Sequence, residues 1–145
     1  MIEIAQIPLI LEEIPPKGIH IFIHGKIQRK TIRFLLDTGA SKSVIDQDFA
    51  NRMFPSARRI ETEHLTTGLG ANIPNAVFLK LRGIKAGKYH LKPITFAVLD
   101  LSVVNQAYIS AKLEPVVAIL GGDILNKYRA VIDYRHQLLQ LEIDD

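Results

Sequence analysis

The sequence predicts an all-β fold with one or two short helices. Most apolar residues stand in short runs rich in Ile, Val and Phe, and Gly, Pro or Asn separate these runs, which is typical of strands joined by turns. The chain has 145 residues, enough for one domain that buries about two-thirds of its unfolded surface. We therefore expect a single domain over residues 1–145.

The expected strands follow in chain order. Residues 19–23 and 31–36 flank a short basic segment, so they predict a hairpin. Further extended segments are expected at residues 76–81, 89–99 and 131–143.

Two short segments predict helices. Ile45, Phe49 and Met53 recur at helical spacing, and Asp46 is placed to cap the start of a helix near residues 45–54. A second helix is expected near the C-terminus, at residues 123–128. Asp123 is the expected N-cap, because its carboxylate can accept hydrogen bonds from the free N–H groups of the first turn.

Composition excludes several classes of protein. The chain has no cysteine, which rules out disulfides, thiolate catalysis and cysteine metal sites. Its net charge of +3 and its lack of Trp give little basis for nucleic-acid binding, so we expect no nucleic-acid partner. No apolar run reaches the roughly 18 residues of a membrane span. The N-terminus does not read as a secretory signal, so we expect no membrane partner and a cytoplasmic location.

One acidic residue stands at the end of an apolar run. Residues 34–41 read Phe-Leu-Leu-Asp-Thr-Gly-Ala-Ser, so Asp37 follows three apolar residues and enters a Thr-Gly turn. Charged side chains are rarely placed at the end of a buried strand unless they are paired, hydrogen-bonded or used in chemistry. Asp37 is therefore the candidate catalytic residue, although the three letters Asp-Thr-Gly alone also fit an ordinary turn.

Two further motifs lie downstream. Residues 117–125 read Val-Ala-Ile-Leu-Gly-Gly-Asp-Ile-Leu, an apolar run followed by a Gly pair and a helix start. Residues 65–73 read Leu-Thr-Thr-Gly-Leu-Gly-Ala-Asn-Ile, and two glycines around one apolar residue suit the tip of a mobile hairpin. An ordinary hairpin turn fits this segment too, whereas the third glycine of a dinucleotide-binding fingerprint is absent.

Together the three motifs resemble those of retropepsin-like (retroviral-type) aspartic proteases, over about residues 32–141. The chain has one Asp-Thr-Gly motif and not two. In this it resembles the half-sized enzymes that act as homodimers, and not the two-lobed pepsins. The expected helix after the motif resembles the cellular and bacterial branch. The resemblance implies a closed or partly open β-barrel equivalent to one pepsin lobe.

The resemblance also implies roles around the catalytic loop. Asp37 would be the catalytic carboxylate, supported by Thr38, Gly39, Ala40 and Ser41. Thr38 would hydrogen-bond across the dimer, Gly39 would permit close backbone approach, and Ser41 would bond the outer carboxylate oxygen.

The other two motifs have implied roles as well. Gly68, Leu69 and Gly70 would form the tip of a flap that closes over a peptide. Gly121 and Asp123 would be structural residues beside the site, with Asp123 capping the helix or bonding the loop. No metal or organic cofactor is implied.

The implied chemistry requires two copies of the chain. Amide hydrolysis needs a base that activates water and an acid that protonates oxygen and nitrogen, and one carboxylate cannot serve as both at once. Two Asp37 side chains across a two-fold axis can, because adjacent like charges cannot both remain ionised. We expect a peptide or protein substrate with apolar residues at the cut, and pocket walls that include Leu69, Ile73 and Val117.

Two questions stay open at this stage. A catalytically silent peptide-binding or dimerisation module would carry the same motifs. The apolar terminal segments, residues 7–11 and 138–141, either pair between subunits or complete the core of one chain. Zinc chemistry is disfavoured, because His20 and His24 lie four residues apart on an expected strand and hence roughly 13 Å apart.

Overall fold

The computed structural model of the chain describes residues 1–14, 18–66 and 72–144. The strands are β1 (Ile2–Pro8), β2 (Ile10–Glu13), β3 (Ile19–Ile27), β4 (Lys30–Leu36), β5 (Val44–Asp46), β6 (Arg59–Thr66), β7 (Asn72–Leu81), β8 (Ile84–Ala86), β9 (Tyr89–Leu91), β10 (Ile94–Leu99), β11 (Ala118–Leu120), β12 (Val131–Asp133) and β13 (Leu138–Asp144). The helices are α1 (Gln47–Met53), α2 (Ser102–Ser110) and α3 (Gly122–Lys127).

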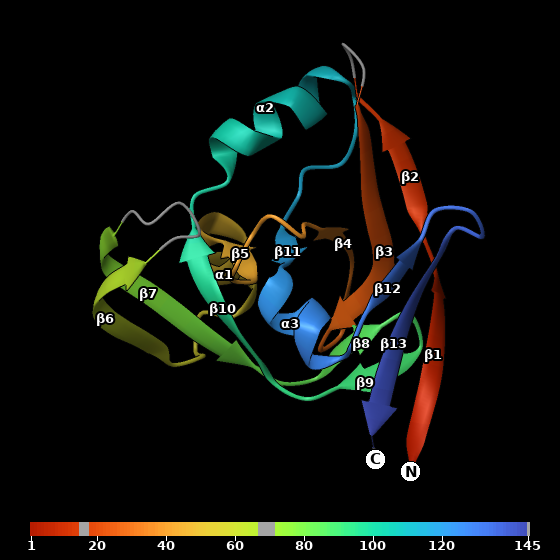
Figure 1. Cartoon of the computed structure of the whole chain (residues 1–145). Helices are drawn as coiled ribbons and strands as arrows, with labels where there is room; N and C mark the ends of the chain where they lie inside the picture. The colour runs from red at the N-terminus through yellow and green to blue at the C-terminus, as the bar shows by residue number, and fades with distance from the viewer. Residues whose placement is uncertain (15–17, 67–71, 145) are drawn as a thin grey trace.

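These strands form two sheets, so the predicted all-β class is confirmed. The larger, ten-stranded sheet has the order β6-β7-β10-β5-β11-β4-β3-β8-β9, with β2 paired to β3. The smaller sheet has the order β1-β13-β12 (Figure 1). Neither order returns to its first strand, so the described sheets are open and the closed form of the expected barrel is not found.

The first predicted hairpin is confirmed. Strands β3 and β4 pair antiparallel, with Ile27 opposite Lys30 at the turn. Gln28 adopts a positive φ of 55° there, and its N–H donates to the carbonyl of Gly83. The strand expected over residues 89–99 is instead divided into β9 and β10, because Pro93 between them has no N–H to donate to a ladder.

The strand pairing brings two of the sequence motifs together. Strand β11 runs parallel to β4, with Leu120 opposite Leu36, and antiparallel to β5, with Ile119 opposite Val44. The apolar run of residues 117–120 therefore lies between the strand that enters the Asp-Thr-Gly turn and the strand that leaves it.

The helices agree with the predictions in part. Asp46 is the N-cap of α1, where its carboxylate accepts a hydrogen bond from the N–H of Phe49, as expected. Helix α3 is also found, but its N-cap is Gly121 and no side chain caps it, so the expected capping role of Asp123 is wrong. Helix α2 was not predicted, because no side chain caps its start at Leu101 and two valines stand in its first turn.

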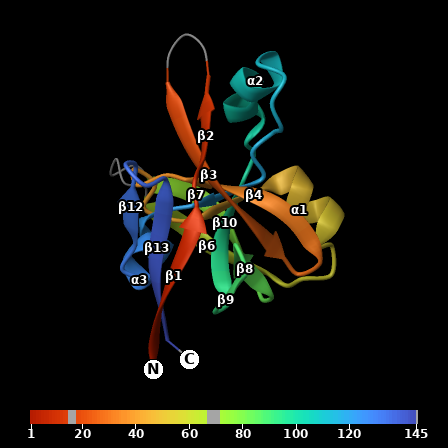
Figure 2. The same cartoon turned by 90° about the vertical axis from the view of Figure 1, so that its right-hand side faces the viewer.

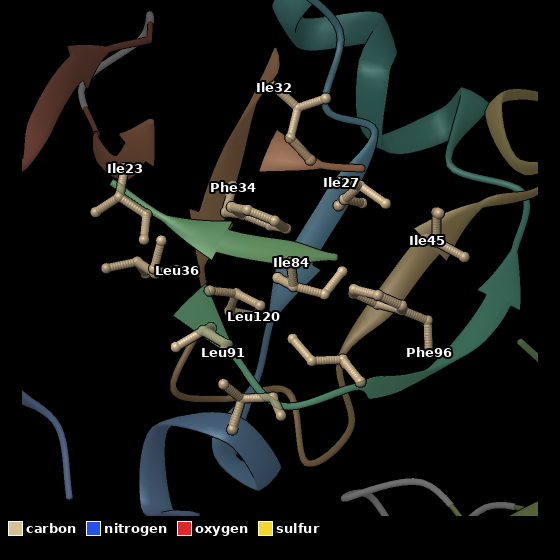
Figure 3. Close-up of a cluster of buried hydrophobic side chains, with 14 of the residues drawn as sticks. Ile23, Ile27, Ile32, Phe34, Leu36, Ile45, Ile84, Leu91, Phe96 and Leu120 are labelled. Carbon is tan, nitrogen blue, oxygen red and sulfur yellow. The ribbon is translucent and has the colours of Figure 1, made fainter. Parts of the chain in front are cut away.

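The main core lies inside the curved larger sheet. Figure 3 shows side chains from different strands meeting there, with Phe34 and Leu36 of β4, Phe96 of β10 and Leu120 of β11 among them. Phe34 and Phe96 are fully buried. A second cluster around Phe22 and Tyr108 joins α2 to the sheet.

The terminal strands complete the core of this single chain. Strands β1 and β13 pair antiparallel along their whole length, with Ile7 opposite Leu139, and both side chains are buried. Of the two roles left open for these segments, the structure shows this one. The outward residues Ile2 and Ile4 are 59% and 52% exposed. No helix in the described part of the chain is long and apolar enough to cross a membrane.

Candidate active site

Asp37 stands at the point where β4 ends, and backbone hydrogen bonds fix it there. Its N–H donates to the carbonyl of Leu120 in β11 at 3.0 Å. The chain then turns back, so that the N–H of Ala40 donates to the carbonyl of Asp37 at 3.2 Å. The N–H of Gly39 donates to Oδ1 of the Asp37 side chain at 3.0 Å. The half-buried carboxylate is thus oriented by its own turn and has its second oxygen free of these bonds.

The glycine pair of the motif at residues 117–125 lies directly against this turn. The N–H of Gly122 donates to the carbonyl of Ala40 at 2.7 Å. A Cβ on Gly121 would lie 2.6 Å from that same carbonyl oxygen and 3.0 Å from the carbonyl of Lys42. Because those neighbours are backbone atoms that cannot rotate away, only glycine permits the approach.

A buried serine connects the loop after Asp37 to α3. Ser43 is fully buried, and its N–H and Oγ both donate to Oδ1 of Asp123, at 3.0 and 2.8 Å. Ser43 Oγ also accepts from the N–H of Gly121 at 2.9 Å. Lys42 Nζ lies 3.6 Å from the other carboxylate oxygen, Oδ2. Asp123 therefore bonds the loop, which is the second of the two structural roles expected for it.

Replacement of Ser43 tests this connection. In Ser43→Ala the N–H of Gly121 loses its partner in a buried place, and the Asp123 carboxylate loses one donor. We expect the free energy of unfolding to fall by about 3 kcal/mol, because each buried polar group left unpaired costs about 1–3 kcal/mol. Urea unfolding of the wild type and the variant measures this change in the free energy of unfolding. Ser41→Ala is the matched control: that side chain is exposed, so a change beyond about 0.5 kcal/mol would be unexpected. Equal stability of the two variants would contradict the assigned role of Ser43.

A cavity of about 660 Å³ opens beside Asp37. Asp37 and Thr38 line it at the end of β4, Ile19 and His20 line it from β3, and Tyr108 lines it from α2. Its size lies within the roughly 300–1,000 Å³ of ligand-binding clefts. Asp37 thus lies in the wall of a cavity that is large enough for a ligand.

The polar lining of this cavity includes a histidine–tyrosine pair. The hydroxyl of Tyr108 lies 2.6 Å from Nδ1 of His20, and the two rings meet edge to face. Burial raises the pKa of the Tyr108 hydroxyl; the positive charge of Arg33 opposes this rise and the negative charge of Asp37 adds to it. The hydroxyl therefore keeps its proton at neutral pH.

Comparison with known proteins identifies the family. A family model described as "Aspartyl protease" matches residues 23–124, which contain the first two motifs along the chain and all but the last residue of the third. The chain belongs to the aspartyl protease family. No curated protein sequence was found to match it.

Two solved structures are similar to this chain. A retropepsin-like aspartic protease from Rickettsia conorii is 19% identical, with a TM-score of 0.57, and the match covers 98% of this chain and 92% of that one. The retroviral protease-like domain of Ddi1 from Leishmania major is 14% identical, with a TM-score of 0.49, and the match covers 83% of this chain and 86% of that one. The first likeness confirms the retropepsin-like fold.

Several of the predicted site residues lie at the loop that follows Asp37. Thr38 and Gly39 are exposed. The expected hydrogen bond of Thr38 would be made to a second copy of the chain, and it stays a prediction. Ala40 contributes its carbonyl to the contact with Gly122. Ser41 is exposed, and in this described loop of one chain it makes no hydrogen bond to Asp37; its expected role also stays a prediction.

The predicted flap falls mostly outside the described residues. Gly68, Leu69 and Gly70 are not among them. On either side, β6 and β7 pair antiparallel up to Thr66 opposite Asn72, with the expected wall residue Ile73 on β7. Val117, the third expected wall residue, is half-buried and packs against the main core.

Sequence reasoning missed two features of the site. One is Ser43, which directly precedes the apolar Val44 and Ile45, a position in which a buried hydroxyl needs hydrogen-bond partners. Tyr108 was missed because α2 was not predicted. In the described part of the chain, no group of three or more His, Asp or Glu side chains is placed to hold a metal ion.

Proposed function

We propose that this chain is an aspartic endopeptidase in which Asp37 from each of two copies forms the catalytic dyad. The observation that carries the proposal is the setting of Asp37. Backbone bonds hold its carboxylate at the junction of β4 and β11, and it opens on a cavity that accommodates part of a peptide. Such rigid placement of a reactive group is what positions it for catalysis.

The neighbouring carboxylates support the need for a second copy. Asp46 accepts from the N–H groups of Phe49 and Leu101. Asp123 is bound to Ser43 and lies beside Lys42. Both are committed to holding backbone in place, so neither serves as the acid or base that partners Asp37. This supports the proposal that Asp37 of another chain supplies the partner carboxylate.

The proposed reaction adds water across the peptide bond. The ionised Asp37 of the dyad takes a proton from a water molecule, whose oxygen attacks the carbonyl carbon. The protonated Asp37 gives its proton to the carbonyl oxygen, which yields a tetrahedral intermediate. Collapse of that intermediate breaks the C–N bond: the Asp37 that took the water proton gives it to the leaving nitrogen, and one hydroxyl of the intermediate returns its proton to the ionised Asp37, which restores the singly protonated dyad. Aspartic proteases are the standard example of two carboxylates that share one proton in this way.

Peptide cleavage by the purified protein tests the proposal. We expect cleavage of an unbiased peptide library between about pH 4 and 7, where a dyad sharing one proton operates, with new termini identified by mass spectrometry. The rate per chain is expected to rise with protein concentration as dimers form, which sedimentation follows on the same samples. A sample that sediments as a dimer but cleaves no peptide of the library would count against the proposed activity and favour a silent peptide-binding module or a highly selective protease.

A further inference from the structure

Helix α2 builds part of the wall of the cavity that Asp37 lines. Figure 2 shows α2 and the paired strands β2 and β3 extending in the same direction, beyond the other strands of the larger sheet. Strand β3 contributes Ile19 and His20 to the cavity lining, and α2 contributes Val104, Ala107 and Tyr108. The three α2 residues have the spacing of one helix face, so that face of α2 meets whatever occupies the cavity.

Helix α2 is fixed to the sheet, although apolar residues such as Val103 remain exposed on its outer side. The side-chain amide of Asn105 is buried and bonds Val116 twice: Nδ2 donates to its carbonyl at 2.9 Å, and Oδ1 accepts from its N–H. Tyr108 is 2% exposed and packs edge to face on Phe22. These contacts hold the inner face of α2 as a rigid wall, which is required of a surface that selects by shape.

The His20–Tyr108 pair gives this apolar wall a directed hydrogen-bond donor. The buried Tyr108 hydroxyl keeps its proton, and among the described residues His20 Nδ1 is its hydrogen-bond partner. We assign the hydroxyl as the donor and Nδ1 as the acceptor, because this arrangement gives the buried hydroxyl hydrogen a partner. A neutral imidazole that accepts at Nδ1 carries its hydrogen on Nε2. His20, which is half-buried and lines the cavity, thus offers an N–H donor.

We propose that this cavity is a substrate subsite for a large side chain with an apolar body and a hydrogen-bond acceptor at its tip, as in tyrosine. Ala107 and Val104 set the space available to the body, and His20 donates to the tip. Tyr108 is a positioning residue that fixes the orientation and tautomer of His20. The inference rests on the proposed function, because it places the substrate residue beside Asp37.

Peptide binding tests the subsite separately from catalysis. The probes are four peptides identical except for Tyr, Phe, Leu or Ala at the position next to the cleaved bond. Binding is measured by fluorescence anisotropy with Asp37→Asn protein, which consumes no peptide. We expect the Tyr peptide to bind about three- to tenfold more tightly than the Phe peptide, which is the contribution of one hydrogen bond. Equal binding of the Tyr and Phe peptides would overturn the polar part of the proposal.

Second substitutions in the same background assign the preference to the pair. In His20→Phe and in Tyr108→Phe the ratio of Tyr to Phe binding is expected to fall to about one. Tyr128→Phe is the matched control: Tyr128 is also buried, and its hydroxyl accepts from the N–H of Lys92, away from this cavity. If the ratio of Tyr to Phe peptide binding fell equally in Tyr128→Phe, the loss would be explained by general destabilisation of the protein. That result would overturn the assignment of the preference to His20 and Tyr108.

The size of the subsite is tested on α2. Ala107→Phe fills the cavity, so binding of the Tyr, Phe and Leu peptides should weaken about ten- to hundredfold while the Ala peptide still binds. Val103→Phe is the control, because Val103 is 75% exposed on the same helix and does not line the cavity. Unchanged selectivity in a folded Ala107→Phe protein would overturn the proposal. Loss of the dimer in sedimentation, with unchanged selectivity, would assign the cavity to the contact between copies instead.

Wild-type protein and the same peptides separate the two claims. Cleavage of the peptides without the predicted ratios would overturn the subsite and leave the protease standing. The predicted binding ratios without cleavage by the wild type would support the subsite and contradict the proposed activity.

Discussion

Asp37→Asn is expected to lower peptide cleavage by roughly a thousandfold or more while the protein stays folded. An amide neither takes a proton from water nor donates one to the carbonyl, so both steps of general acid–base catalysis lose their group, and such steps contribute about 10²–10⁴-fold each. Cleavage of a peptide selected from the library, followed by mass spectrometry over time, measures the loss.

The fold should tolerate this replacement. The side-chain oxygen of an asparagine at this position can still accept the hydrogen bond that Gly39 donates to Oδ1 of Asp37, so we expect the free energy of unfolding to change by less than about 0.5 kcal/mol. Asp48→Asn is the matched control: its carboxylate is exposed in α1 and pairs with Arg52, away from the site. Undiminished cleavage by pure Asp37→Asn protein would exclude Asp37 as the catalytic group.

Gly121→Ala is expected to produce the second large effect, on stability and activity together. The new Cβ would lie 2.6 Å from the carbonyl oxygen of Ala40 and 3.0 Å from the backbone of Lys42. Relief of these contacts must move the catalytic turn away from α3, which also strains the bond between Gly121 and Ser43. We expect the free energy of unfolding to fall by about 3 kcal/mol and cleavage to fall with it, as measured by urea unfolding and the peptide assay.

The adjacent glycine provides the control for this substitution. A Cβ on Gly122 would lie 3.5 Å from the same carbonyl oxygen, which is ordinary van der Waals contact. Gly122→Ala should therefore keep most of the stability and activity. If Gly121→Ala were as stable and active as Gly122→Ala, the close packing of the two motifs would not be what holds the catalytic turn.

The sequence was sufficient for much of the fold because local signals and long-range pairing agree there. The hairpin of β3 and β4 follows from two apolar runs around a polar turn, and the N-cap of α1 follows from Asp46. Helix α2 gave no such signal: its stability comes from tertiary contacts, namely the bonds of Asn105 to Val116 and the packing of Tyr108.

The residues of the candidate site also fall into those that a local sequence pattern identifies and those that only long-range contacts bring together. Asp37 was identified from an apolar run that ends in a charge, which is a local pattern. The bond between Ser43 and Asp123 joins residues that are 80 positions apart, and the contact of His20 with Tyr108 joins residues that are 88 apart. Only the strand order, with β11 inserted between β4 and β5, brings the first of these pairs together.

Mixing two forms of the subunit tests the shared dyad most directly. Wild-type and Asp37→Asn proteins are combined in equal amounts at low concentration, allowed to exchange, and concentrated into dimers. Random pairing leaves about one quarter of the dimers with two Asp37 carboxylates, so activity per wild-type chain should fall to about half that of the unmixed enzyme. Activity per wild-type chain that is unchanged by mixing, in dimers shown to have exchanged, would contradict a dyad built from two copies.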